Sequence, residues 1–178
     1  MDLLRLKQTK KDVIKFHKFI VGVMGGGDDV SPKTMDTAYQ LGKLIAEENW
    51  VLLCGGRPKG VMEASAKGAR EAGGLTVGIL PNKDKTCASE NIDICITTGM
   101  GDARNYINIL SSDIVVALPG RAGTISEIAL ALRNEKKVIL LNFDLRDVFD
   151  YYRKKGLLLT ANTPEKVIRL IKEFRSIQ

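Results

Sequence analysis

The sequence predicts an α/β protein with a doubly wound, mostly parallel sheet and helices on both faces. Short, apolar and largely β-branched runs alternate along the chain with segments of helical periodicity. These runs are continuous rather than alternating with polar residues, as in strands that are buried on both faces of a parallel sheet. Because the 178 residues contain no linker, repeat or low-complexity segment, we expect one domain over 1–178.

The first half of the chain alternates between strand-like and helix-like segments. Leu41, Leu44 and Ile45 recur at helical spacing. Ser31 followed by Pro32 is typical of a helix N-cap and a first helical position. In chain order we expect strands at 19–25, 50–54, 75–80 and 92–98, and helices at 34–49 and 60–73.

The second half continues the alternation. In "GMGDAR", Asp102 is the expected N-cap of a helix, which places Arg104 in the first turn. The basic, amphipathic residues 1–18 are expected to form a helical extension, and "LLLT" lies between the last two helical segments. We expect strands at 114–119 and 137–142, and helices at 102–112, 124–134, 146–155 and 164–175.

Composition narrows the classes of partner. A formal charge of +6 favours acidic ligands, but the cations are scattered and aromatic residues are only 6%, which argues against a nucleic-acid platform. Three cysteines without a CxxC pair and a single histidine argue against a structural metal and favour reduced thiols. No run approaches the ~20 apolar residues of a membrane span, and the N-terminus has no secretory pattern. We therefore expect a cytoplasmic protein without metal or membrane contact.

Glycine clusters follow three of the expected strands: "GGGDD" after the first, "GGRPKG" after the second and "PGRAGT" after the fifth. Glycine lets backbone N–H groups approach a ligand closely, and the start of the following helix supplies free donors and a partial positive charge. In an open parallel sheet, ligands bind beyond the carboxyl ends of the strands. Three such loops at one edge predict a site for a phosphorylated ligand.

Two common nucleotide-binding motifs are missing. A dinucleotide dehydrogenase requires GxGxxG after the first strand and an acid after the second, but the chain has Gly25-Gly26-Gly27-Asp28 and Cys54-Gly55 there. No GxxxxGK[ST] loop occurs either. These absences favour a mononucleotide or a nucleotide-like cofactor, held mainly from the second and fifth strand ends.

The glycine motifs resemble those of a known superfamily. "ALPGRAGTISE" is similar to the PGGxGTxxE signature of the LONELY GUY and lysine decarboxylase-like proteins, and "GGRPKGVM" to their second glycine-rich loop. "GDARNYINILSSDIVVALPG" matches the segment in which an arginine precedes the signature. The resemblance covers roughly 20–170. "GGRPKGVMEASAKGAREAGGLTVGILP" and "ARN" are most similar to the branch of the molybdenum cofactor carrier proteins.

The resemblance implies a Rossmann-like nucleotide-binding domain, a pterin or nucleotide ligand, and assembly into homodimers or homotetramers. In the LONELY GUY branch, phosphoribohydrolases cleave the N-glycosidic bond of nucleoside 5′-monophosphates, and the catalytic pair would here be Arg104 and Glu127. No further cofactor is required. The phosphate and ribose contacts carried over from the family are Gly55, Gly56, Gly60, Gly120, Gly123 and Thr124. Further candidate contacts in this sequence are Met62, Arg57 and Arg121, and also Gly25 and Gly26, unless their loop is an ordinary strand-to-helix turn.

Three positions depart from the hydrolase signature. Arg57 and Arg121 stand where the signature has glycine, and Asn105 replaces a lysine after the motif arginine. The two arginines offer forked donors to phosphate oxygens, or they are solvated loop charges. Either way they change the range of ligands that the pocket admits.

The two residues of the predicted catalytic pair also have structural interpretations. Thr124 and Glu127 fit a capping box, in which the threonine caps the helix and the glutamate reaches back to the N-cap amide. Arg104 could be solvated or paired with Asp102. However, a cation in a first helical turn opposes the helix dipole by ~0.3–1 kcal/mol, which an anionic ligand would reverse.

Two functions of different classes fit these residues. The first is a molybdenum cofactor carrier-like protein, which holds a pterin phosphate without turning it over. The second is a phosphoribohydrolase, in which Glu127 and Arg104 act on a nucleoside 5′-monophosphate. The sequence slightly favours the first.

Overall fold

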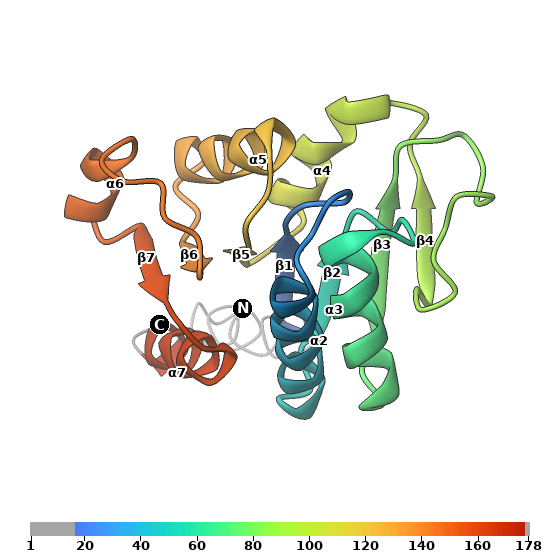
Figure 1. Cartoon of the computed structure of the whole chain (residues 1–178), viewed down its shortest axis with the longest axis horizontal. Coiled ribbons are helices and arrows are strands. Elements are labelled where there is room, and N and C mark those ends of the chain that lie inside the picture. Colours follow the sequence, from blue (N-terminus) through green and yellow to red (C-terminus); the bar gives the residue numbers. More distant parts are fainter. Residues whose placement is uncertain (1–16, 177–178) are drawn as a thin grey trace, which may run out of the picture.

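A computed structural model describes residues 17–176, so the helical extension expected at 1–18 lies almost entirely outside the described residues. Strands and helices alternate along the chain (Figure 1). The strands are β1 (Ile20–Met24), β2 (Val51–Cys54), β3 (Thr76–Leu80), β4 (Ile94–Thr97), β5 (Ile114–Ala117), β6 (Val138–Leu141) and β7 (Leu158–Ala161). The helices are α2 (Pro32–Glu47), α3 (Gly60–Glu71), the 3-10 turn η1 (Gly101–Ala103), α4 (Arg104–Leu110), α5 (Ala122–Arg133), α6 (Asp150–Lys154) and α7 (Pro164–Ser176).

All seven strands join one sheet in the order β4-β3-β2-β1-β5-β6-β7. Every neighbouring pair is parallel, which confirms the doubly wound α/β class and sharpens "mostly parallel" to parallel throughout. The chain builds outward from β1 to β4 and then crosses back to place β5 on the other side of β1. The carboxyl ends of β1 and β5 therefore form the switch point at which open α/β sheets bind ligands.

Helices cover both faces of the sheet, as expected. On one face, α2, α3 and α7 pack on a core that includes Leu41, Ile45 and Val167. On the other, α4, α5 and α6 pack on a second core that includes Ile109 and Ile128. In Figure 1, α4, α5 and α6 lie in the upper part of the view, and α2, α3 and α7 lie in its lower part.

The edge strand β4 is less well covered than the central strands. Ile94 and Ile96 are 45% and 44% exposed, whereas Cys95 between them packs against the core under α2 and α3. Successive side chains of a strand point to opposite faces, so the two isoleucines lie on the sheet face of α4 and α5. The helices on that face leave both side chains partly uncovered.

Several predicted boundaries change in the structure. Ser31 caps α2 as expected, accepting a hydrogen bond from the Thr34 backbone N at 3.2 Å. Asp102, however, is not an N-cap: the chain enters a 3-10 turn at Gly101, whose φ of 56° turns the backbone one residue earlier. The "LLLT" segment forms strand β7, which extends the sheet beyond the predicted strands.

The predicted capping box of α5 is wrong. The helix begins at Ala122 with Arg121 as its N-cap, and no side chain accepts a capping hydrogen bond there. Thr124 is therefore the third residue of the helix and not its N-cap, so it cannot form a capping box with Glu127. The capping interpretation of Glu127 is thereby removed.

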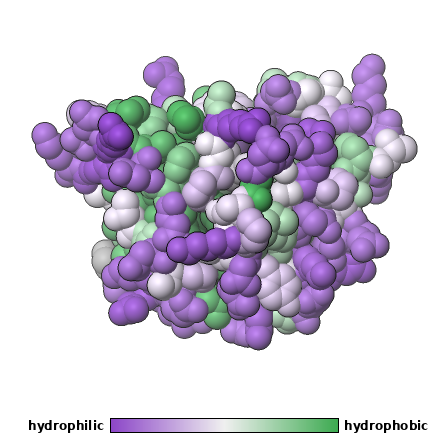
Figure 2. All heavy atoms as spheres, viewed as in Figure 1, coloured by the Kyte–Doolittle hydropathy of each residue, from purple (hydrophilic) through white to green (hydrophobic). Residues whose placement is uncertain are grey.

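The face of the molecule in Figure 2 is predominantly polar. Hydrophilic residues cover most of the face in Figure 2, and hydrophobic ones gather chiefly in its upper left part. None of the helices within 17–176 is both long and apolar enough to cross a bilayer. The three cysteines, Cys54, Cys87 and Cys95, are all free thiols.

Candidate functional site

The three glycine-rich loops meet at the carboxyl edge of the sheet, beside the switch point. Backbone hydrogen bonds join them: Gly26 N donates to Pro119 O at 3.0 Å, and Val61 N donates to Gly26 O at 2.9 Å. The loop after β1 therefore lies between the loops that follow β2 and β5. This arrangement confirms that glycine clusters far apart in sequence share one edge.

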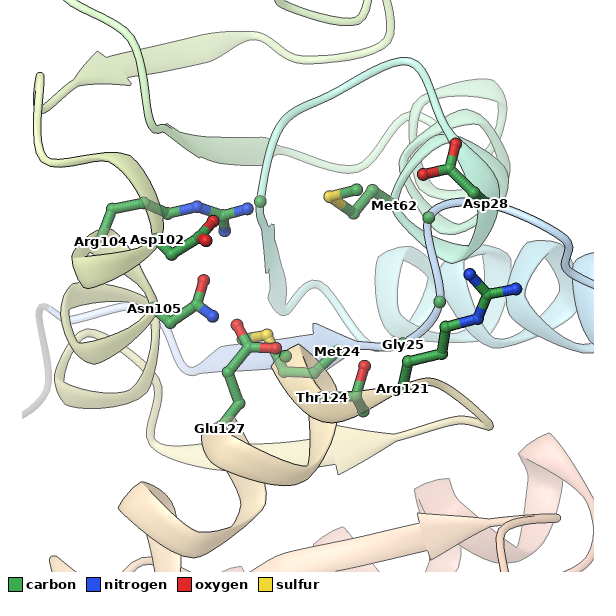
Figure 3. Close-up of a pocket in the computed structure, with 14 residues that line it drawn as sticks. Met24, Gly25, Asp28, Met62, Asp102, Arg104, Asn105, Arg121, Thr124 and Glu127 are labelled. Atoms are coloured by element: carbon green, nitrogen blue, oxygen red, sulfur yellow. The ribbon is translucent and has the colours of Figure 1, made fainter.

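A cavity of about 240 Å³ opens between these loops, α4 and α5 (Figure 3). Nine of the predicted site residues line it: Gly25, Gly26, Gly55, Met62, Arg104, Arg121, Gly123, Thr124 and Glu127. Four do not line it: Gly56, Arg57, Gly60 and Gly120. Residues that had no place in the predicted site also line it: Met24, Gly27, Asp28, Asp102 and Asn105.

The glycines outside the cavity wall hold the loops together. Gly60 has a φ of 53°, and a Cβ there would overlap the carbonyl oxygens of Gly26 and Gly27. Gly56 has a φ of 73° and lies against Gly78 of β3. Their direct role is to let backbones approach closely, so the predicted ligand contacts at these two positions stay predictions.

Arg104 is the first residue of α4 and is only 9% exposed. Its Nε atom is buried and has no hydrogen-bond partner within the described chain. Burial lowers the pKa of Arg104 from its ordinary value, and the nearby Glu127 carboxylate opposes that shift. A buried cation with an unused donor, at the wall of a cavity, is suited to receive an anion.

Gly55 has a specific partner in this arrangement. A Cβ at Gly55 would overlap Nη1 of Arg104 and lie 2.6 Å from the sulfur of Met62. The missing side chain therefore leaves room for the guanidinium group, which extends from α4 toward the loop after β2 (Figure 3). This contact gives the glycine of the second loop a role that the sequence pattern did not indicate.

Glu127 projects from α5 into the same space and is 6% exposed. Its Oε1 atom accepts a hydrogen bond of 2.9 Å from Nδ2 of Asn108 on α4. Burial raises the pKa of Glu127 to about 7, against the opposing effects of Asn108 and Arg104. A carboxyl group with a pKa near neutrality can act as a general acid or base.

Two ion pairs join charged residues at the mouth of the cavity. Arg121 Nη2 lies 2.6 Å from Oδ2 of Asp29, and Lys59 Nζ lies 2.9 Å from Oδ1 of Asp28. The side chains of Arg121 and Asp29 are about three-quarters exposed, so each pair is weak on its own. Together they link the first loop to the other two.

Asn108 is the residue that the sequence analysis missed. It is fully buried and lies one helical turn after Arg104, on the same side of α4. That spacing was visible in the sequence, but its meaning depends on Glu127, which comes from a different helix.

No group of three or more His, Cys, Asp or Glu within the described residues could hold a metal ion. Cys54 lies at the end of β2, and burial raises the pKa of its thiol to about 11. A thiol with that pKa is neutral, so it does not add charge to the site.

The fold and the arginine and PGRAGT motifs define a member of the LONELY GUY and lysine decarboxylase-like superfamily. Within it, the chain belongs to the SLOG cluster4 family, whose model matches residues 18–168.

Solved structures similar to this chain include two proteins whose names refer to the molybdenum cofactor. The molybdenum cofactor binding protein from Rippkaea orientalis is 51% identical, with a TM-score of 0.84, over 89% of this chain and 98% of that one. The molybdenum cofactor carrier protein from Chlamydomonas reinhardtii is 42% identical, with a TM-score of 0.83, over 90% of this chain and 99% of that one.

Curated relatives include members of the hydrolase branch. A cytokinin riboside 5′-monophosphate phosphoribohydrolase from Mycobacterium tuberculosis is 32% identical over 110 residues, which cover 61% of this chain and 59% of that protein. An uncharacterized protein from Archaeoglobus fulgidus is 50% identical over 121 residues, covering 68% of this chain and 78% of that protein.

Proposed function

We propose that the chain binds a phosphorylated, nucleotide-like molecule in the cavity, as a molybdenum cofactor carrier-like protein. The observation that supports this most directly is Arg104, a buried cation at the cavity wall that forms no ion pair among residues 17–176. A buried charge is costly unless an opposite charge or hydrogen bonds compensate it. A bound phosphate would supply both.

The start of α5 offers a second set of donors to that phosphate. The N-cap residue of α5 is Arg121, and no side chain accepts a hydrogen bond from the first backbone N–H groups of the helix. These N–H groups of the twelve-residue helix are therefore available to a ligand. Gly123 has no neighbouring atom within 4 Å of a Cβ position, which leaves space above these groups. The molybdenum cofactor would enter this site as cargo, held by its phosphate and pterin.

The structural relatives favour the carrier function over a general nucleotide-binding one. Two proteins with names that refer to the molybdenum cofactor match nearly the whole described chain at 42% and 51% identity. The three free cysteines fit a reducing compartment, and we place the protein in the cytoplasm.

A second candidate is the phosphoribohydrolase, favoured by the carboxyl group of Glu127. This group is buried beside the cavity with a pKa of about 7. In such a reaction, water adds to C1′ of the ribose while the C1′–N bond breaks and the base departs with a proton. Glu127 would stabilise the positive charge that develops on the sugar or take the proton of the attacking water, and Arg104 would hold the 5′-phosphate.

Two measurements distinguish the candidates. Mass spectrometry of the native protein should identify a copurified pterin phosphate if the chain is a carrier. Incubation with a panel of nucleoside 5′-monophosphates should release free base if it is a hydrolase. Absence of both base release and pterin binding would contradict both candidates.

Arg104→Ala tests the phosphate site itself. We expect the dissociation constant of a nucleoside 5′-monophosphate or a pterin phosphate to rise by roughly 10- to 100-fold, as for the loss of a hydrogen bond to a charged group. Calorimetric titration measures this change. Arg133→Ala, which removes an exposed arginine from the far end of α5, is the matched control. Unchanged affinity in Arg104→Ala would remove the arginine from the site.

We also propose that the chain forms a homodimer or homotetramer through the sheet face at β4 and α4. Large apolar side chains are exposed on both elements, and a second copy of the chain would cover them. These side chains are Ile94, Ile96, Tyr106 and Leu110.

A further inference from the structure

Asn108 is fully buried beside the cavity but does not line it. Its Nδ2 atom donates to Oε1 of Glu127 at 2.9 Å and lies 3.9 Å from the sulfur of Met24. Its Oδ1 atom is buried without a hydrogen-bond partner in the described chain. A buried amide whose oxygen forms no hydrogen bond costs free energy. A polar side chain at this position therefore needs an explanation.

The position of Asn108 on α4 supplies that explanation. Arg104 and Asn108 are four residues apart and therefore share one side of the helix. Arg104 reaches the cavity from the first turn, and Asn108 reaches Glu127 of α5 from the second. One short helix thus positions both the cation and the carboxylate of the pocket.

We propose that Asn108 is a positioning residue, which holds the carboxyl group of Glu127 at the cavity wall in both of its protonation states. Its Nδ2 donates to the ionised carboxylate, as in the structure. When Glu127 takes up a proton, rotation of the amide presents Oδ1, the unpartnered atom, to accept a hydrogen bond from the carboxyl O–H. The consequence for ligand binding rests on the proposed function; the effect on Glu127 does not.

Few other groups influence this carboxyl group. Among residues 17–176, Arg104 on α4 is the one charged side chain that stabilises its ionised form, and Asp102 of η1 acts on the arginine. From β2, Cys54 presents a neutral thiol, and from β1, Met24 presents an uncharged thioether. Burial favours the protonated form, and Asn108 and Arg104 oppose it. Removal of the amide should therefore shift the titration of Glu127 upward.

The experiment is a pH titration of the side-chain carboxyl carbons by NMR, on the whole chain labelled with ¹³C-glutamate. Glu127→Gln identifies the Glu127 signal by its loss. Asn108→Leu keeps the size and removes both hydrogen bonds. Because the bond to the ionised carboxylate is the stronger of the two, we expect the midpoint of Glu127 to rise by about 1 unit.

A second variant keeps the test decisive if Asn108→Leu does not fold. Asn108→Asp preserves size and polarity, but it places two carboxyl groups in contact, which share one proton and raise the midpoint of the last ionisation. Tyr106→Phe on the same helix removes only the hydrogen bond to Asn134 and should leave the midpoint unchanged. An unshifted Glu127 midpoint in the folded Asn108 variant overturns the proposal.

Binding then separates this proposal from the proposed function. The dissociation constant of a nucleoside 5′-monophosphate is measured against pH for the parent and for Asn108→Leu. The pH at which this constant changes should be displaced in the variant by the same amount as the midpoint of Glu127. If no phosphorylated probe binds the parent protein, the proposed function fails, while the NMR titration still decides the role of Asn108.

Discussion

At the scale of single residues, Glu127 is a buried carboxyl group that changes its protonation state near neutral pH. Its carboxyl group is 6% exposed, and its pKa is raised to about 7 from the usual 4.5. The buried Arg104 does not lie within ion-pair distance of it in the described structure, since no ion pair joins the two among residues 17–176. Both side chains therefore line the cavity without forming an ion pair with each other.

Glu127→Gln should make the free energy of unfolding less dependent on pH. The folded chain keeps the Glu127 proton up to about pH 7, whereas the unfolded chain loses it near 4.5. Stability from this group is therefore present below pH 4.5 and decreases by about 3 kcal/mol as the pH rises to 7. Urea unfolding at several pH values measures the difference between variant and parent.

We expect the variant to match the parent near pH 4 and to be more stable above pH 7. All other titrating groups are common to both proteins and cancel in the comparison. If the variant and the parent had equal free energies of unfolding at pH 8, the buried surroundings would not destabilise the ionised form of Glu127.

Gly55→Ala should impair the site through Arg104. The added Cβ would overlap the guanidinium group, which must then move. We expect the affinity for a nucleoside 5′-monophosphate to fall about as far as in Arg104→Ala, by roughly 10- to 100-fold. In the double variant, Gly55→Ala should cause little further loss, because the residue that it displaces is already absent. Additive losses in calorimetric titration would instead indicate a direct role for Gly55.

At the scale of elements, the start of α5 depends on tertiary contacts. The sequence predicts a helix start at Thr124, but the chain becomes helical at Ala122. The preceding loop is fixed by the Gly26 N to Pro119 O hydrogen bond, and a Cβ on Gly120 would overlap the Thr124 side chain. The loop after β1 thus packs on this turn, a contact that no local pattern in the sequence reveals.

Gly123→Ala separates folding from binding at this helix start. In the structure a Cβ there meets no atom within 4 Å, and alanine is the better helix former by up to ~1 kcal/mol. The melting temperature should therefore stay equal or rise. If a phosphate lies on the first amides of α5, the methyl group meets it, and affinity for the phosphorylated probe falls. Unchanged affinity would place the phosphate elsewhere.

At the scale of the whole molecule, the sheet order decides which loops meet. The sequence predicted the strand-helix alternation, the parallel sheet and the three glycine-rich strand ends, and the structure confirms them. It could not predict that β5 lies next to β1, because strand order follows from packing between segments that are far apart along the chain. Nor did it indicate that Asn108 would reach Glu127.

The proposed assembly makes a prediction at this scale. Sedimentation equilibrium should give two or four times the chain mass for the parent protein. Ile96→Lys places a charge on the exposed face of β4 and should shift the mass toward that of one chain. Ser126→Lys, an exposed position on α5, is the control for added charge. A parent that sediments as a single chain would contradict the assembly.

The sequence by itself determined the α/β class, the glycine-rich edge and the arginine and glutamate of the predicted pair, because each depends on local periodicity or on a short motif. The tertiary structure decided the strand order, the start of α5 and the placement of Arg104 against Gly55 and of Glu127 against Asn108. The same physical reason applies to the strand order, to the helix start and to these placements. Burial, a raised pKa and an unpartnered donor arise from contacts between segments that only packing brings together.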